Sequence, residues 1–201
     1  DMLSSYCESK EDIDKTVINT IYSEITDTIR KETADATYRM LFAATGNTEY
    51  LAQGIKEVVQ KNDLVYFGKF QEGIDADLYF VGSWTDKGCC SEEIKSLLSS
   101  LKNKKIAYFQ TAGFGGSQAY FKRLLDTVMK LIDSSSEFLG SYFYQGRMPD
   151  SVKNRYLMML EKNPNDERIL ASLDNFEKAK SHPDFDDLKR IKEWAHSMID
   201  T

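Results

Sequence analysis

A hydroxyl- and glycine-containing turn follows the first apolar stretch of the chain. Residues 43–48 read Ala-Ala-Thr-Gly-Asn-Thr, and helical periodicity begins at Glu49. A helix N-terminus has unpaired N–H groups and partial positive charge, so it attracts anions. Thr45 and Thr48 add hydroxyl donors, and Gly46 lets the backbone approach a ligand. Without a lysine the turn is no Walker loop. It suits one terminal phosphate, although a Gly-Asn turn with Thr48 as helix N-cap explains it nearly as well.

Two later turns also follow apolar stretches. Residues 83–88 read Ser-Trp-Thr-Asp-Lys-Gly, and Trp84 can either stack on a flat ring or cover the edge of the core. Residues 111–116 read Thr-Ala-Gly-Phe-Gly-Gly, and these glycines either let backbone N–H groups approach a ligand or form a flexible loop. Each signal is weak alone. Together the three turns predict a site for a planar heterocycle that carries one phosphate.

The elements that must position these turns alternate between strand and helix. Such alternation predicts a parallel sheet with helices on both faces, and ligands bind beyond the carboxyl ends of its strands. All three turns are expected at that edge. We predict strands at 38–43, 64–67, 78–83, 105–111 and 137–144, and helices at 49–60, 92–101, 118–132, 150–160 and 184–199.

Residues 1–36 precede the alternating pattern. Their β-branched residues recur every four positions, which predicts an amphipathic helix at about 10–33. We therefore divide the chain into an N-terminal helical extension, 1–36, and an α/β domain, 37–201. The helix needs a packing partner, either the domain itself or a second copy in a homodimer; the tail of an upstream segment is the alternative. The apolar face of this predicted helix consists of Ile13, Val17, Ile21, Ile25 and Ile29.

Composition excludes several functions. The formal net charge of -6 argues against nucleic acid as the main partner. No apolar run approaches the length of a membrane span, and the three cysteines form neither a disulfide framework nor a metal motif, so we expect a cytoplasmic protein. Small residues at a helix start explain Cys89 and Cys90 better than redox catalysis does. No nucleophile, general base or metal cluster stands out, and His182 and His196 are expected at the surface.

The order of these motifs resembles the flavodoxin family. Residues 43–48 look like its phosphate loop, Ser/Thr-x-Thr-Gly-x-Thr, residues 82–88 like the loop on one flavin face, and residues 111–116 like the loop at the pyrimidine edge. The resemblance implies a five-stranded parallel sheet in the order 2-1-3-4-5 and FMN as cofactor. Residues 82–88, 104–113 and 140–147 resemble in particular a short flavodoxin-like group from anaerobic gut bacteria, some of whose members accompany bilirubin reductase.

The resemblance also implies which residues bind the cofactor. The phosphate would be held by Ala44, Thr45, Gly46, Asn47 and Thr48. The ring would be contacted by Ser83, Trp84, Thr85 and Gly88, and its polar edge by Thr111, Ala112, Gly113, Phe114 and Gly115. Three departures bear on affinity: Ala43 replaces the usual first hydroxyl, Asp86 stands where an aromatic residue is common, and no Asp-Tyr pair follows the third turn, Tyr120 being the nearest tyrosine.

Three functions follow from this resemblance. The first is an FMN-binding electron-transfer protein that donates electrons to a partner oxidoreductase. The second is an NAD(P)H-dependent FMN reductase acting on a quinone or another small acceptor, so whether the protein is an enzyme stays open. The third is a degenerate binding or dimerisation module without flavin.

Overall fold

The computed structural model describes residues 38–42, 46–59, 63–69, 75–115 and 117–200. From Thr37 onward the chain forms one compact unit. The helix predicted at 10–33, and with it the predicted division of the chain and the predicted homodimer contact, lies outside the described residues.

The core is a five-stranded sheet in which all neighbouring strands run parallel. The strand order is β2-β1-β3-β4-β5, which is the order that the resemblance implies. The predicted α/β fold with a parallel sheet is confirmed. The strands are β1 (Tyr38–Phe42), β2 (Leu64–Gly68), β3 (Leu78–Trp84), β4 (Lys105–Ala112) and β5 (Glu137–Gln145).

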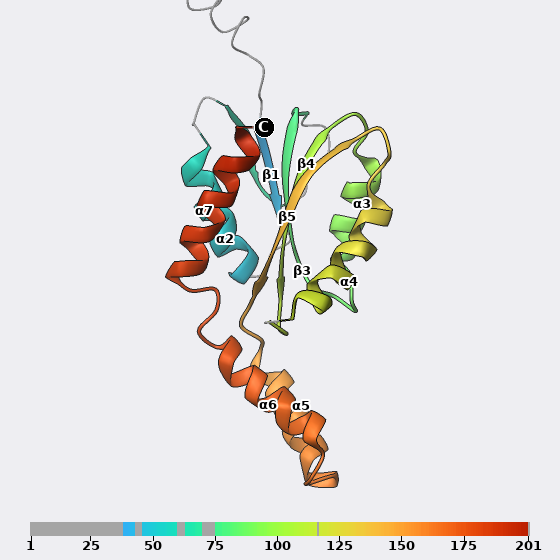
Figure 1. Ribbon diagram of the computed structural model, residues 1–201, viewed down its shortest axis with the longest axis vertical. Helices are drawn as coiled ribbons and strands as arrows, with labels where there is room; N and C mark the ends of the chain where they lie inside the picture. The colour runs from blue at the N-terminus through green and yellow to red at the C-terminus, as the bar shows by residue number, and fades with distance from the viewer. Residues whose placement is uncertain (1–37, 43–45, 60–62, 70–74, 116, 201) are drawn as a thin grey trace, which may run out of the picture. The chain divides into compact units, whose positions relative to one another are not determined.

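Helices cover both faces of the sheet, so its central strands are buried on both sides (Figure 1). On one face lie α2 (Gly46–Val58) and α7 (Phe185–Ile199); on the other lie α3 (Glu92–Ser100) and α4 (Gln118–Val128), which continues into a 3-10 turn, η1 (Met129–Leu131). Two-sided burial explains why β3 and β4 consist mostly of apolar residues. Among the described residues, no helix is both long and apolar enough to cross a membrane.

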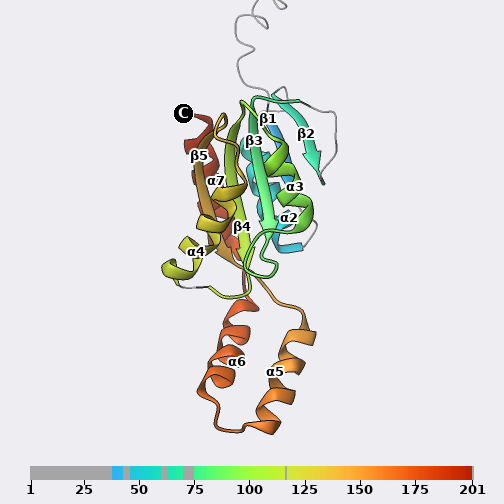
Figure 2. The same ribbon diagram turned by 90° about the vertical axis from the view of Figure 1, so that its right-hand side faces the viewer.

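A helical hairpin separates β5 from α7. It consists of α5 (Asp150–Lys162) and α6 (Glu167–Ala179), and it extends beyond the carboxyl edge of the sheet (Figures 1 and 2). We predicted a helix at 150–160 but none at 167–179. The signals for α6 are its N-cap, Asp166, whose carboxylate accepts from two backbone N–H groups, and the buried residues Ile169 and Phe176.

The contact between β3 and β4 leaves no room for a side chain at Gly82. A Cβ there would lie 2.2 Å from Phe109 Cζ, in a fully buried ring. We expect Gly82→Ala to lower the free energy of unfolding by about 1–3 kcal/mol, because overpacking forces the ring or the strands to move. Urea denaturation would measure the loss.

Gly140 in β5 provides the matched control for this substitution. A Cβ there would lie 3.2 Å from Met198 Sδ, near the end of a flexible side chain. Gly140→Ala should therefore stay within about 1 kcal/mol of the parent protein. Equal losses for the two variants would show that overpacking against Phe109 is not the cause.

Candidate functional site

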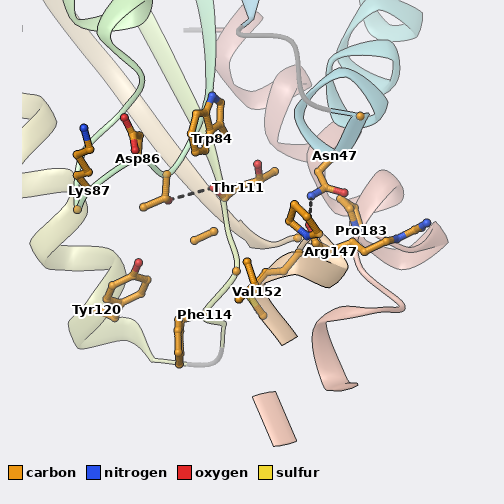
Figure 3. A pocket seen from close by; sticks show the side chains of 18 of the residues that line it. Asn47, Trp84, Asp86, Lys87, Thr111, Phe114, Tyr120, Arg147, Val152 and Pro183 are labelled. Carbon is orange, nitrogen blue, oxygen red and sulfur yellow. Dashed lines mark hydrogen bonds between the residues drawn. The ribbon is translucent and has the colours of Figure 1, made fainter. Parts of the chain in front are cut away.

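A cavity of about 1340 Å³ lies where the start of α2 meets the turns after β3 and β4 (Figure 3). Its remaining walls come from Tyr120 of α4, from the segment after β5, and from α5. The sheet brings the three turns together because all its strands end at the same edge.

Most of the predicted site residues surround this cavity. Thr48, Ser83 and Gly115 do not line it, and Ala44 and Thr45 lie outside the described residues. The ligand contacts of all fourteen residues stay predictions. Nine of them line the cavity: Gly46, Asn47, Trp84, Thr85, Gly88, Thr111, Ala112, Gly113 and Phe114.

Thr48 is fully buried beneath the cavity. Its Oγ1 lies 2.9 Å from Thr111 Oγ1, and this hydrogen bond joins the start of α2 to the end of β4. At Gly46, by contrast, an added Cβ would meet no atom of the described residues within 4 Å. The N-terminus of α2 therefore borders open space, where its backbone N–H groups can receive an anion.

The second turn is a tight reversal from Asp86 to Cys89. These two residues exchange backbone hydrogen bonds of 2.9 and 2.8 Å, and the central residues, Lys87 and Gly88, have φ values of 45° and 79°. Positive φ at both central positions is typical of a type I′ turn. The turn places Lys87 and Gly88 at the cavity wall.

A buried amide fixes the second turn to the sheet. Gln110 Oε1 accepts from the Tyr108 hydroxyl at 2.9 Å, while its Nε2 donates to Thr85 Oγ1 at 2.9 Å and to the Cys89 carbonyl at 3.1 Å. Thr85 Oγ1 in turn donates to the Thr111 carbonyl at 3.0 Å. We did not select Gln110 from the sequence; its signal is a long polar side chain within an otherwise apolar strand.

Ser83 and the two cysteines support the same turn from below. Ser83 Oγ accepts from the Ser91 backbone N–H at 3.0 Å, so its hydroxyl holds the segment that leads into α3. Cys89 and Cys90 are free and buried. Burial, together with the neighbouring Cys89, raises the pKa of the Cys90 thiol to about 12. This disfavours the Cys90 thiolate that redox chemistry would need. Both cysteines belong to the buried core cluster beside α3.

The glycines of the third turn have a packing role. A Cβ on Gly113 would lie 2.5 Å from Met148 Sδ, and one on Gly115 would lie 2.5 Å from the side chain of Gln145. The Gly113 carbonyl also accepts a 2.9 Å hydrogen bond from Asn175 Nδ2 of α6. The glycines therefore let the end of β5 and the segment after it pack tightly against this turn.

Trp84 and Phe114 provide flat aromatic surface at the cavity. They are 38% and 42% exposed, although both lie on turns that are held firmly by buried neighbours. The Phe114 and Tyr120 rings pack edge to face with their centroids 6.4 Å apart. An apolar planar ligand could bury these exposed faces.

Three comparisons identify the family. Residues 39–196 match the model of the flavodoxin domain. The chain belongs to the flavodoxin family. It is 33% identical over 162 residues to a flavodoxin-like domain-containing protein, BilS, of Clostridioides difficile strain CD3, covering 77% of this chain and 91% of that protein. It is 33% identical over 181 residues to BilS of Clostridium symbiosum strain WAL-14163, covering 81% and 95%.

A solved structure agrees with the fold of this flavodoxin domain. Oxidised flavodoxin 2 from Bacillus cereus superposes with a TM-score of 0.50 at 17% identity, over 82% of this chain and 99% of that one.

Part of the cavity wall in this flavodoxin domain was not predicted from the sequence. That part comes from the segment after β5 and from the hairpin. Asn47 Nδ2 donates to the Arg147 carbonyl at 2.8 Å, which places the start of this segment beside α2. No sequence pattern shows that α5, which leads away from the carboxyl edge of the sheet, borders the cavity there. The lining residues outside the prediction are Tyr50, Asp86, Lys87, Tyr120, Gly146, Arg147, Met148, Pro149, Val152, Arg155, Tyr156 and Pro183.

A polar network at the start of α7 holds another part of the wall. The Arg147 N–H donates to the His182 carbonyl at 2.9 Å, and His182 Nδ1 lies 2.6 Å from Asp187 Oδ2. Asp187 also accepts from Arg190 and forms a capping box with Asp184. His182, Asp184 and Asp187 are close enough to hold a metal ion, but these bonds give the buried carboxylate a structural role.

The Asp187 carboxylate should make stability depend on pH. Burial by itself raises its pKa, but hydrogen bonds from His182, the Asp184 N–H and Arg190 outweigh burial and hold the pKa below its usual 3.8. A depressed pKa stabilises the fold above the unfolded-state value, and this contribution falls as the pH drops through about 4 toward the lower folded-state value. We expect Asp187→Asn to lose about 1–2 kcal/mol at pH 7, with a smaller loss at pH 3.5.

Urea midpoints of the parent protein and the variant at both pH values would test this. Asp186→Asn is the control, because its carboxylate lies on the same helical turn but is exposed. An equal loss for Asp187→Asn at both pH values would contradict the assignment.

Proposed function

We propose that this chain is an FMN-binding electron-transfer protein that donates electrons to a partner oxidoreductase, in the cytoplasm. The observation that carries the proposal is the meeting of three strand-end turns around one cavity at the carboxyl edge of the sheet. One turn borders a helix N-terminus, one presents a tryptophan beside a type I′ turn, and one presents a phenylalanine. This combination fits a flat ring attached to a phosphate.

The phosphate end of the cofactor would lie at the start of α2. Gly46 leaves the first helical turn open, and Asn47 holds the segment of Arg147 against it. A guanidinium is well suited to pair with phosphate oxygens. Arg147 lines the cavity and has no carboxylate within 4 Å among the described residues, so it can supply the positive charge that the uncharged turn at 43–48 lacks.

The ring would lie between the second and third turns. Trp84 offers a stacking face, and the backbone of Lys87 and Gly88 offers a donor and an acceptor to ring nitrogens. When bound, FMN supplies the capacity to take up and release electrons one or two at a time. Asp86 disfavours added negative charge on a nearby ring and Lys87 opposes this effect, so the turn would help to set the reduction potential.

The buried supports would keep this environment fixed during electron transfer. Gln110 holds both Thr85 and the Cys89 carbonyl, and Asn175 holds the Gly113 carbonyl. Fixed dipoles around a cofactor need little rearrangement when its charge changes. Exposed aromatic edges at the cavity mouth would lie where a partner protein approaches.

Titration of the purified protein with FMN tests the proposal, with flavin fluorescence and the visible spectrum as readouts. We expect one FMN per chain. Trp84→Ala should weaken binding roughly 10–100-fold, since stacking on an aromatic ring is worth about 1–3 kcal/mol. Phe185→Ala is the control: this ring is 76% exposed and outside the cavity lining.

Two results would decide against this proposal. A parent protein that takes up no FMN would favour a binding module without flavin. Rapid bleaching of the bound flavin by NAD(P)H alone would favour a reductase over a pure carrier.

The charge of Arg147 gives a second prediction. Arg147→Ala should weaken FMN binding roughly tenfold, because a charge-assisted hydrogen bond to phosphate is lost. Its FMN affinity should also depend less on salt than that of the parent protein. Fluorescence titrations at 20 and 300 mM salt would measure both effects. Arg147→Lys should keep most of the salt dependence; the same dependence in Arg147→Ala would rule out an ionic role.

A further inference from the structure

The cavity is larger than the pockets that usually hold one small ligand. Pockets that enclose one drug-sized ligand have volumes of about 300–1,000 Å³, whereas this cavity has about 1340 Å³. The difference of roughly 300 Å³ is itself the size of a small-ligand site. The three strand-end turns occupy one part of the wall, and α5 forms another (Figure 3).

One side of α5 faces this additional space. Val152, Arg155 and Tyr156 have the spacing i, i+3 and i+4, so they share one face of the helix, and all three line the cavity. In Figure 3, Val152 lies between Phe114 and Arg147, below Trp84 and Thr111. The α5 face therefore continues the aromatic wall that the turns begin.

Packing of α5 against the rest of the protein does not account for the residues on its cavity face. Lys153 packs against α6 through a 2.6 Å ion pair with Glu177 and a cation–π contact with Phe176. Yet none of the thirteen residues of α5 is buried. A helix whose apolar residues are all at least partly exposed gains little from tertiary packing. Its cavity face is thus available to a ligand.

The charge of the cavity indicates the class of ligand. Its charged lining residues are three basic ones, Lys87, Arg147 and Arg155, and one acidic one, Asp86, although the whole chain has a net charge of -6. Arg147 lies beside α2, at the phosphate end of the proposed FMN site. Arg155 has no carboxylate within 4 Å among the described residues; its guanidinium carbon lies 5.9 Å from the Tyr156 ring centroid.

We propose that the part of the cavity lined by α5 is a second ligand site, beside the FMN site, for a flat organic molecule that bears a carboxylate. Arg155 binds the carboxylate through its planar fork of N–H groups. Tyr156, Phe114 and Val152 bury the flat part of the molecule. This inference rests on the proposed function, since the site is defined next to bound FMN.

The test uses the full chain and begins with FMN. After saturation with FMN, the protein is titrated with anthraquinone-2-carboxylate by calorimetry, and retention of FMN is followed by its fluorescence. We expect saturable binding without loss of FMN. The neutral analogue 2-(hydroxymethyl)anthraquinone should bind at least tenfold more weakly, because it lacks the charge that Arg155 recognises.

Variants on the hairpin separate the site from the stability of the fold. Arg155→Ala should weaken binding of the carboxylate probe roughly tenfold or more and leave FMN affinity unchanged. Tyr156→Ala should weaken both probes. Arg168→Ala is the matched control, because this arginine is exposed on α6 outside the cavity lining and should change neither affinity.

The outcomes distinguish this inference from the proposed function. Failure of the parent protein to bind FMN would overturn both. Tight FMN binding without probe binding, displacement of FMN by the probe, or equal affinity of Arg155→Ala and the parent protein for the carboxylate probe would overturn only the second site.

Discussion

The satisfied amide of Gln110 is the interaction on which the site depends most. An amide within a fully buried strand must find partners for its polar atoms, since each unpaired one would cost about 1–3 kcal/mol. Here it accepts from Tyr108 and donates to Thr85 and to the Cys89 carbonyl. The second turn can thus project into a cavity and still keep one conformation. The buried residues Ser83 and Cys90 pack beside the second turn on its core side.

The hairpin is fixed to the same edge of the sheet by a separate set of bonds. Asn175 of α6 donates to the Gly113 carbonyl, and its own Oδ1 accepts from Gln145 Nε2 at 3.1 Å. The buried Phe176 of α6 lies next to this contact in the chain. α5, in contrast, packs mainly through α6, so one helix holds the hairpin in place and the other is free to present its residues to the cavity.

The alternation of strands and helices was predictable from the sequence because a parallel sheet buries both faces and leaves long apolar runs. The edge of the sheet that carries the cavity followed from the same argument. Gln110 and Asn175 could not be chosen, because an amide in a strand or a helix does not reveal which turn it will hold. Arg155 could not be placed either, since the path of α5 depends on contacts between α6 and Gly113.

The glycines of the third turn have a packing role beside the ligand contact that the sequence predicts for them. Its glycines indicated close approach of the backbone to a ligand, and the turn does border the cavity. Yet Gly113 and Gly115 make room for Met148 and Gln145, which are protein side chains. Glycines in a turn indicate that another group approaches the backbone closely. They do not indicate whether that group belongs to a ligand or to the protein itself. Here the end of β5 and the segment after it come close, so the glycines that suggest a cofactor loop also make room for the chain that leads to the hairpin.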